Sequence, residues 1–134
     1  MTTPTPPLPA DIIAALRNRD VVLVTSRDES GTGTVPMGFA LAPPGVVYLL
    51  TSTFSRKAQR WERDSWIRLS IPGGGAAVEG SAHPVAAGDI DPALAEILLA
   101  RFGDSGASTP EALRQVLETG AHVLLRVDGL RRGD

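Results

Sequence analysis

The chain contains no cysteine, and it carries no excess of positive charge, because its formal net charge at pH 7 is -2. Thiolate nucleophiles, disulfide frameworks, iron–sulfur clusters and cysteine-based zinc sites all require the missing side chain. Proteins that follow nucleic-acid phosphates usually have a strong basic excess. The composition therefore excludes cysteine chemistry and argues against a nucleic-acid partner.

Long apolar runs are missing as well, since no stretch approaches the roughly 20 apolar residues of a membrane-spanning helix. Residues Met1 to Pro9 contain four prolines and three threonines but neither the basic nor the apolar region of a signal peptide. We therefore expect a disordered arm over residues 1–9 and a single cytoplasmic domain over residues 10–134, without a membrane partner. A chain of 134 residues buries roughly two thirds of its unfolded surface, enough for one core.

The spacing of apolar residues after the arm predicts short strands and a few helices. Strands are expected over residues 21–26, 34–41, 46–52, 66–71, 76–85 and 122–128. Helices are expected over residues 11–19 and 54–63, from the Asp91-Pro92 pair to Gly103, and from the Thr109-Pro110 pair to Gly120. Six strands separated by frequent turns predict a mainly β fold with α, a small antiparallel β-barrel with helices packed on its outside.

The segment that joins the third strand to the helix after it has the features of a phosphate site. The strand ends in the hydroxyls of Thr51 and Ser52, and Ser55 lies where a helix N-cap belongs. The first helical turn then offers free backbone N–H groups, the positive end of the helix dipole, Arg56 and Lys57. Arginine supplies a bidentate fork and lysine a compact charge, so the arrangement fits a terminal phosphate ester.

An ordinary amphipathic helix is the alternative for residues 54–63. Phe54, Ala58 and Trp61 share the spacing of a buried stripe, while the basic residues gather on the opposite, solvated side. This interpretation accounts for Arg60 and Arg63. Cations in a first helical turn oppose the macrodipole, however, and an anion at that place would resolve the conflict.

The strand over residues 34–41 has one nearly bare face, since its even positions Pro36, Gly38 and Ala40 are all small. Such a face leaves room for a flat ring against the backbone, whose amides can hydrogen-bond the ring's edge. A small-residue face can equally admit a neighbouring strand or helix. Together with the phosphate site, the pattern points to a phosphorylated planar cofactor such as flavin mononucleotide (FMN).

Three short motifs together are similar to those of one known family. In chain order they are Val35-Pro36-Met37-Gly38, Leu50-Thr51 followed by Ser55-Arg56-Lys57-Ala58-Gln59, and Val78-Glu79-Gly80-Ser81-Ala82. On these motifs residues 21–85, about half of the chain, resemble the pyridoxamine 5'-phosphate oxidase-like, FMN-binding split-barrel family.

The resemblance implies a split barrel, a homodimer with two cofactor sites at its interface, and an oxidoreductase acting on a small-molecule redox substrate. No residue stands out as a catalytic acid or base, and no histidine has metal-ligand spacing. The expected cofactor-binding residues are Val35, Pro36, Met37, Gly38, Leu50, Thr51, Ser52, Ser55, Arg56 and Lys57.

Departures from the family pattern keep other functions open. Val35 and Gly75 stand where the oxidase has an arginine and a glutamine that serve the cofactor, and its C-terminal substrate-binding region has no counterpart before Asp134. Oxidation of pyridoxamine phosphate is therefore not expected. The alternatives are a reductase that uses the deazaflavin coenzyme F-420 and a non-enzymatic dimer that binds flavin or no cofactor. A haem protein with His83 or His122 as ligand is more distant.

Overall fold

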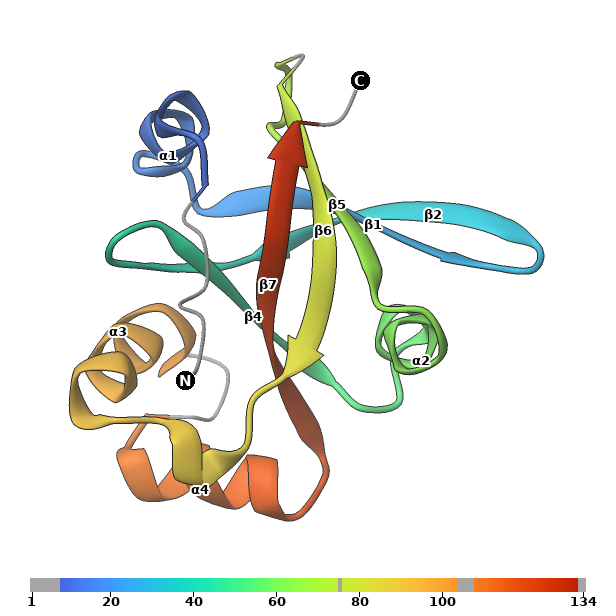
Figure 1. The fold of residues 1–134 in the computed structure, drawn as a ribbon. Coiled ribbons are helices and arrows are strands. Elements are labelled where there is room, and N and C mark those ends of the chain that lie inside the picture. The colour runs from blue at the N-terminus through green and yellow to red at the C-terminus, as the bar shows by residue number, and fades with distance from the viewer. Residues whose placement is uncertain (1–7, 75, 104–107, 133–134) are drawn as a thin grey trace, which may run out of the picture.

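Seven strands form one antiparallel sheet in the computed structural model, which describes residues 8–74, 76–103 and 108–132 (Figure 1). The strands are β1 (Val21–Asp28), β2 (Gly31–Gly38), β3 (Ala40–Ala42), β4 (Val46–Ser52), β5 (Trp66–Ser70), β6 (Ala77–Pro84) and β7 (His122–Arg132). Their order across the sheet is β2-β1-β5-β6-β7-β4-β3. The sheet curls into a half-barrel, so that β2 at one edge also contacts β4 near the other.

Helices surround the sheet, and the predicted helix starts are confirmed at two of them. The helices are α1 (Ala10–Leu16), α2 (Arg56–Arg63), the short 3-10 helix η1 (Ala87–Asp89), α3 (Pro92–Phe102) and α4 (Pro110–Glu118). The side chain of Asp91 accepts the N–H of Leu94 at 2.7 Å, and that of Thr109 accepts the N–H of Ala112 at 3.1 Å. Within residues 8–74, 76–103 and 108–132 no helix has the length and apolarity to span a bilayer.

The predicted six strands become seven because the segment 34–41 divides at Phe39. Strand β2 stays paired with β1 as far as Gly38, whereas Ala40 in β3 faces Tyr48 of β4. Side chains alternate between the two faces in the same way before and after Phe39. The alternation therefore could not show that the paired strand changes from β1 to β4 at this residue. The strand count was wrong, and the mainly β, antiparallel architecture with peripheral helices is confirmed.

The hairpin between β1 and β2 is tighter than predicted. The two strands were expected to end at residue 26 and to resume at residue 34, but β1 runs to Asp28 and β2 already begins at Gly31, which has a φ of 130°. The carboxylate of Asp28 accepts the backbone N–H of Ser30 at 2.8 Å and so closes the turn. As a result the hairpin is long enough to project past α2 (Figure 1).

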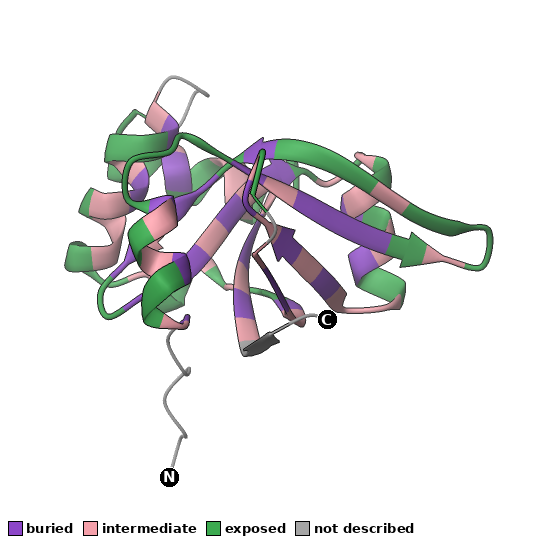
Figure 2. Cartoon of the chain, turned by 90° about the horizontal axis from the view of Figure 1, so that it is seen from above, coloured by how far each residue is buried: buried purple, intermediate pink, exposed green. Residues whose placement is uncertain are grey.

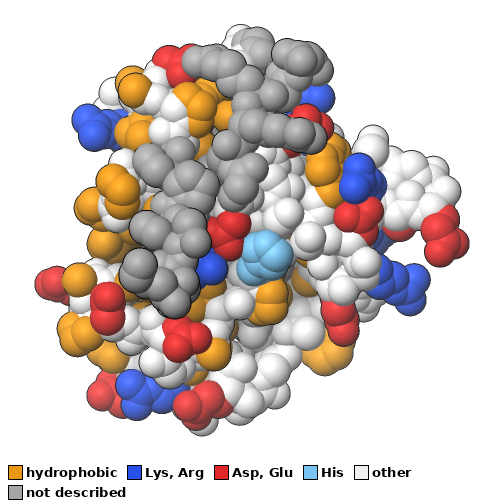
Figure 3. Space-filling view, viewed as in Figure 1, with side chains coloured by type: hydrophobic (Ala, Val, Ile, Leu, Met, Phe, Trp, Pro, Cys, Tyr) orange, Lys and Arg blue, Asp and Glu red, His pale blue; other side chains and the backbone are white. Residues whose placement is uncertain are grey.

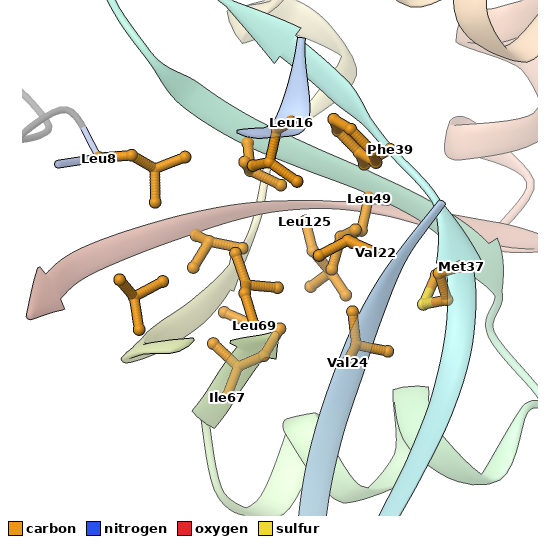
Figure 4. Close-up of a cluster of buried hydrophobic side chains, with 14 of the residues drawn as sticks. Leu8, Leu16, Val22, Val24, Met37, Phe39, Leu49, Ile67, Leu69 and Leu125 are labelled. Carbon is orange, nitrogen blue, oxygen red and sulfur yellow. The ribbon is translucent and has the colours of Figure 1, made fainter. Parts of the chain in front are cut away.

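The main hydrophobic core fills the inside of the half-barrel (Figure 4). Buried residues come from the central strands, and α1 and α2 add the side chains of Ile12, Leu16 and Trp61. Burial is concentrated on the middle of the sheet, whereas β2 is exposed along most of its length (Figure 2). The exposed part of the hairpin therefore makes little contribution to the core.

The expected disordered arm over residues 1–9 lies outside the described residues, except for its last two. Leu8 is buried in the main core, and its backbone N–H donates to the carbonyl of Gly45 at 2.9 Å. The arm prediction therefore does not hold for Leu8, which packs as part of the domain.

A second, smaller core lies where α3 and α4 cover the sheet. Leu98 and Phe102 of α3 and Leu113 of α4 pack against Ala40 and Leu124 of the sheet. Helix α3 thus covers the small residue Ala40, the last position of the face predicted to be bare. At this position the alternative interpretation, a neighbouring helix, is the right one.

Candidate functional site

Ser55 caps α2 and has no proton left to offer a ligand. Its Oγ accepts the N–H of Ala58 at 3.2 Å and donates to the carbonyl of Ser52 at 2.9 Å. The Oγ1 of Thr51 lies 3.3 Å from the same oxygen, so Thr51 is the donor in that pair. The cap predicted at Ser55 is confirmed, and these hydroxyls shape the loop in front of the helix.

Several other donors at the start of α2 remain free. The backbone N–H groups of Arg56 and Lys57 lie in the first helical turn, which has no intrahelical acceptors, and no described residue accepts from them. The hydroxyl oxygen of Ser52 accepts the N–H of Phe54 at 3.2 Å, which leaves its own proton available. Three uncommitted donors therefore surround the N-terminus of the helix, where an anion is favoured.

Two cationic side chains stand beside these donors. The side chain of Arg56 is 73% exposed, and its nearest carboxylate is Asp28, with Nη2 and Oδ2 3.7 Å apart. Lys57 is half-buried, and no described acidic group lies within ion-pair distance of its ammonium. At least one of the two charges is thus unpaired, so an incoming phosphate would not have to displace a complete set of partners.

Arg60 does not lie on a solvated face, contrary to the amphipathic-helix interpretation. Its side chain is 11% exposed, and its Nε donates to Oδ2 of Asp28 at 2.8 Å. Its Nη1 donates to the hydroxyl of Ser26 at 3.4 Å and lies against the backbone of Gly33, where a larger residue would collide with it. The helix is therefore clamped to the β1–β2 hairpin through a mostly buried guanidinium.

Phe54 was predicted in the buried stripe of the helix, and that prediction was wrong. Helix α2 begins at Arg56, so Phe54 lies in the preceding loop, where it is 79% exposed. Ala58 and Trp61, the other two members of the stripe, are buried as predicted. An exposed aromatic side chain thus stands next to the candidate phosphate site.

Asp28 links the hairpin turn to α2, and the pKa of its carboxyl group is strongly lowered. Hydrogen bonds from the hydroxyl of Ser30, from Arg60 and from the N–H of Ser30 hold the pKa of Asp28 well below its usual range. The carboxylate is therefore ionised at any pH at which the protein would normally act, and it stays available to the arginines.

We expect Asp28→Asn to lower the melting temperature at pH 7 by a few degrees and to have a smaller effect near pH 2. The pKa of Asp28 is lower in the folded chain than the value of about 3.9 for an unfolded aspartate. Its stabilisation is present above the unfolded value and is lost as the pH falls toward the folded one. Thermal melts at both pH values test this, with the exposed Glu29→Gln as control. An equal loss at both pH values would contradict it.

Strand β2 places its predicted ring-contacting residues on two different faces. Met37 points into the main core (Figure 4), and Val35, 41% exposed, shares that face beyond the end of the core. Pro36 and Gly38 point the other way and are exposed. Gly33 lies on the same face of β2 as Val35 and Met37, and it contacts Arg60 of α2. Helix α2 therefore packs on that face. The bare face therefore points away from the phosphate donors.

The outer edge of β2 carries backbone groups that no neighbouring strand uses. Strand β2 is an outer strand of the sheet, so half of its backbone N–H and C=O groups have no partner strand. The strand also contacts β4, whose end carries Leu50, Thr51 and Ser52. Leu50 itself packs against the second core and offers the site only its backbone. Hydrogen bonds to the edge of a ring would therefore come from this edge of the strand, a geometry that alternation alone could not indicate.

The remaining expectations concern Gly75, a metal site, the two histidines and the surface charge. Gly75 lies outside the described residues. Among the residues that are described, no three histidine, aspartate or glutamate side chains gather closely enough to hold a metal ion. His83 faces Arg126 across the sheet and His122 faces Ser52, so the two imidazoles belong to different neighbourhoods. Positive and negative side chains alternate over the face shown in Figure 3, without a broad patch of one sign.

Several solved structures share this fold at low sequence identity. A protein of unknown function from Agrobacterium tumefaciens has a TM-score of 0.65 and 17% identity, over 93% of this chain and 57% of that one. A proposed pyridoxamine 5'-phosphate oxidase from Listeria innocua has a TM-score of 0.61 and 18% identity, over 91% and 94% of the two chains. The heme storage protein HutZ from Vibrio cholerae has a TM-score of 0.59 and 16% identity, over 96% of each chain.

At 16–18% identity these similarities show a shared fold and nothing about function. No protein-family model matches the sequence, and no curated protein does either. The chain spans 57% of the length of the Agrobacterium tumefaciens neighbour. The split-barrel fold expected from the sequence motifs is supported by the Listeria innocua and Vibrio cholerae structures, of which one is a proposed oxidase and the other a heme storage protein.

Proposed function

We propose that this chain binds FMN where the start of α2, the end of β4 and the free edge of β2 meet, and that it acts as an oxidoreductase on a small molecule. One observation carries the proposal: the amides of Arg56 and Lys57 lack acceptors while both residues also present cationic side chains. Such a set of donors at a helix N-terminus suits the dianionic phosphate of FMN. The oxidase fold of the Listeria innocua neighbour agrees with this choice of cofactor.

Each group in the proposed site has a definable role. Arg56, Lys57 and the hydroxyl of Ser52 bind the phosphate, while Thr51 and Ser55 hold the loop in shape. The ring lies along the free edge of β2 at residues 35–38, where backbone groups rather than side chains bind it. FMN itself supplies the hydride and electron chemistry, and the protein binds and orients it.

A second copy of the chain would complete the proposed site. Phe54 is 79% exposed in the loop before the phosphate donors, and Val35 is 41% exposed on the face of β2 against which α2 packs. Exposed apolar side chains that cluster around a site are typical of an interface. We therefore propose a homodimer in which these residues contact the partner and exclude water from the ring.

The visible absorbance spectrum of the purified protein tests the cofactor directly. We expect a bound flavin, or saturable binding of added FMN at micromolar concentration followed through quenching of tryptophan fluorescence. The same titration with coenzyme F-420 distinguishes the deazaflavin alternative, because that cofactor also carries a phosphate but has a different ring. Failure of both cofactors to bind at micromolar concentration would overturn the proposal in favour of a dimer without cofactor.

A further inference from the structure

A groove lies where α1, the turn between β3 and β4, and α3 come together. Figure 1 shows this turn between the two helices. The groove has a volume of about 490 Å³, within the range of about 300–1,000 Å³ that is typical of small-molecule sites. Ile13, Leu41 and Ile97 line it, one from each of α1, β3 and α3, and all three side chains are only partly buried. The groove therefore presents apolar surface that the described residues do not fully cover.

Arg101 is held in the wall of the groove by three hydrogen bonds. Its Nε donates to the carbonyl of Phe39 at 2.8 Å, and its Nη1 and Nη2 donate to Oδ1 and to the backbone carbonyl of Asp20 at 3.1 and 3.2 Å. Its guanidinium carbon also lies 5.3 Å from the centre of the Phe39 ring. A guanidinium has five N–H groups, so two of them have no described acceptor, and the side chain is 33% exposed. The groove thus contains a fixed cation with donors to spare.

Two further arginines give the groove a net positive charge. Arg17 and Arg19 follow the C-terminal end of α1 and line the groove, and both are exposed. No carboxylate of the described residues lies within ion-pair distance of either one. The described wall contains no aspartate or glutamate, and Asp20, which pairs with Arg101, does not belong to it. Charge complementarity therefore favours an anion next to the apolar surface.

We infer that this groove binds an amphipathic carboxylate, with its apolar body along the aliphatic side chains and its carboxylate among Arg17, Arg19 and Arg101. The planar fork of arginine matches the two oxygens of a carboxylate, and the aliphatic wall accounts for the apolar body. No residue of α2 and none of residues 35–38 lines the described wall. The inference therefore stands or falls independently of FMN binding.

Nuclear magnetic resonance of the 15N-labelled, full-length protein provides the test. Octanoate is the probe, and octanamide, which has nearly the same shape without the charge, is its control. We expect octanoate to shift the backbone amide signals of Ala42 and Gly45 saturably, since both residues line the groove. It should bind about fivefold more tightly than octanamide, because each exposed ion pair contributes a factor of roughly 1.5 to 5. The amide signal of Lys57, at the proposed phosphate site, should stay in place. Equal affinity for the two probes, or no saturable shift, would overturn the inference.

Two double variants locate the charge effect in the groove. Arg17→Gln/Arg19→Gln should reduce the preference for octanoate to about twofold, the share of one remaining arginine, while octanamide binds as before. Arg63→Gln/Arg114→Gln removes the same charge at exposed positions outside the groove and should keep the full preference. The same loss in both double variants would reflect net charge alone and would contradict a carboxylate contact in the groove.

A third variant tests the space itself. Ala100 lines the groove from an exposed position of α3, so Ala100→Trp should fill it and abolish binding of both probes. Analytical ultracentrifugation of this variant without ligand should show the oligomeric state of the unaltered protein. A changed oligomeric state would mean that the groove is an interface between copies of the chain, and it would overturn the inference. Should a variant fail to fold, the comparison of the two probes on the unaltered protein still decides.

Discussion

Replacing Arg56 and Lys57 together by alanine should weaken FMN binding by at least about 100-fold. A hydrogen bond to a charged group contributes about 1.5–3 kcal/mol, and two such groups are removed from the phosphate at once. Every 1.4 kcal/mol corresponds to a tenfold change in affinity. The fold should be unaffected, because Arg56 is 73% exposed and its nearest carboxylate, Asp28, keeps its closer partner Arg60. Fluorescence titration of the protein without cofactor gives the dissociation constants.

Two controls separate the phosphate contact from a general loss of charge. The double variant Arg17→Ala/Arg63→Ala changes the net charge by the same amount at exposed positions away from the first turn of α2, and it should bind FMN normally. Riboflavin lacks the phosphate, so its weaker binding should be the same in the unaltered and the Arg56/Lys57 proteins. FMN affinity that is unchanged in the Arg56/Lys57 variant would refute the site.

Leu98→Ala should lower the free energy of unfolding by about 2–5 kcal/mol, the range for removing a large side chain from a packed core. Leu98 is completely buried between α3 and the sheet, where it packs with Ala40, Phe102 and Leu124. The small Ala40 cannot close the space that the leucine leaves, so little of the cavity would relax away. Urea unfolding followed by circular dichroism measures the change.

Glu96→Ala is the matched control for this loss, because it lies on the same helix and is exposed. Surface substitutions of this kind usually change stability by less than about 0.5 kcal/mol. A cost of less than about 1 kcal/mol for Leu98→Ala would contradict the packing of α3 on the sheet through Leu98.

Local capping signals in the sequence were enough to predict where α3 and α4 begin. Asp91 and Thr109 precede prolines, and both side chains accept a hydrogen bond from the helix they start. Ser55 does the same for α2. A helix cap involves residues only three positions apart, so its physics is present in the sequence itself. The same holds for the alternating strands, whose buried faces require no knowledge of the partner strand.

Features that depend on distant partners could not be predicted in this way. The chain changes sheet neighbours at Phe39, which depends on the positions of β1 and β4 rather than on the local pattern. Arg60 looked like a surface cation because its partner, Asp28, lies 32 residues earlier in the chain. For the candidate site the donors at Arg56 and Lys57 were predictable from one helix start. The side from which β2 offers its backbone required the three-dimensional arrangement.

The bond between Arg60 and Asp28 has a consequence for ligand affinity. It fastens the hairpin that carries β2 to the helix that carries the phosphate donors, with Nε and Oδ2 2.8 Å apart and the guanidinium against Gly33. The spacing between the two halves of the proposed cofactor site is therefore set before any ligand arrives. A ligand that spans both halves loses little free energy to ordering them, and preorganisation of this kind raises affinity without adding a contact. Loosening this clamp would weaken ligand binding at the proposed site even though Arg60 is not one of the proposed phosphate donors.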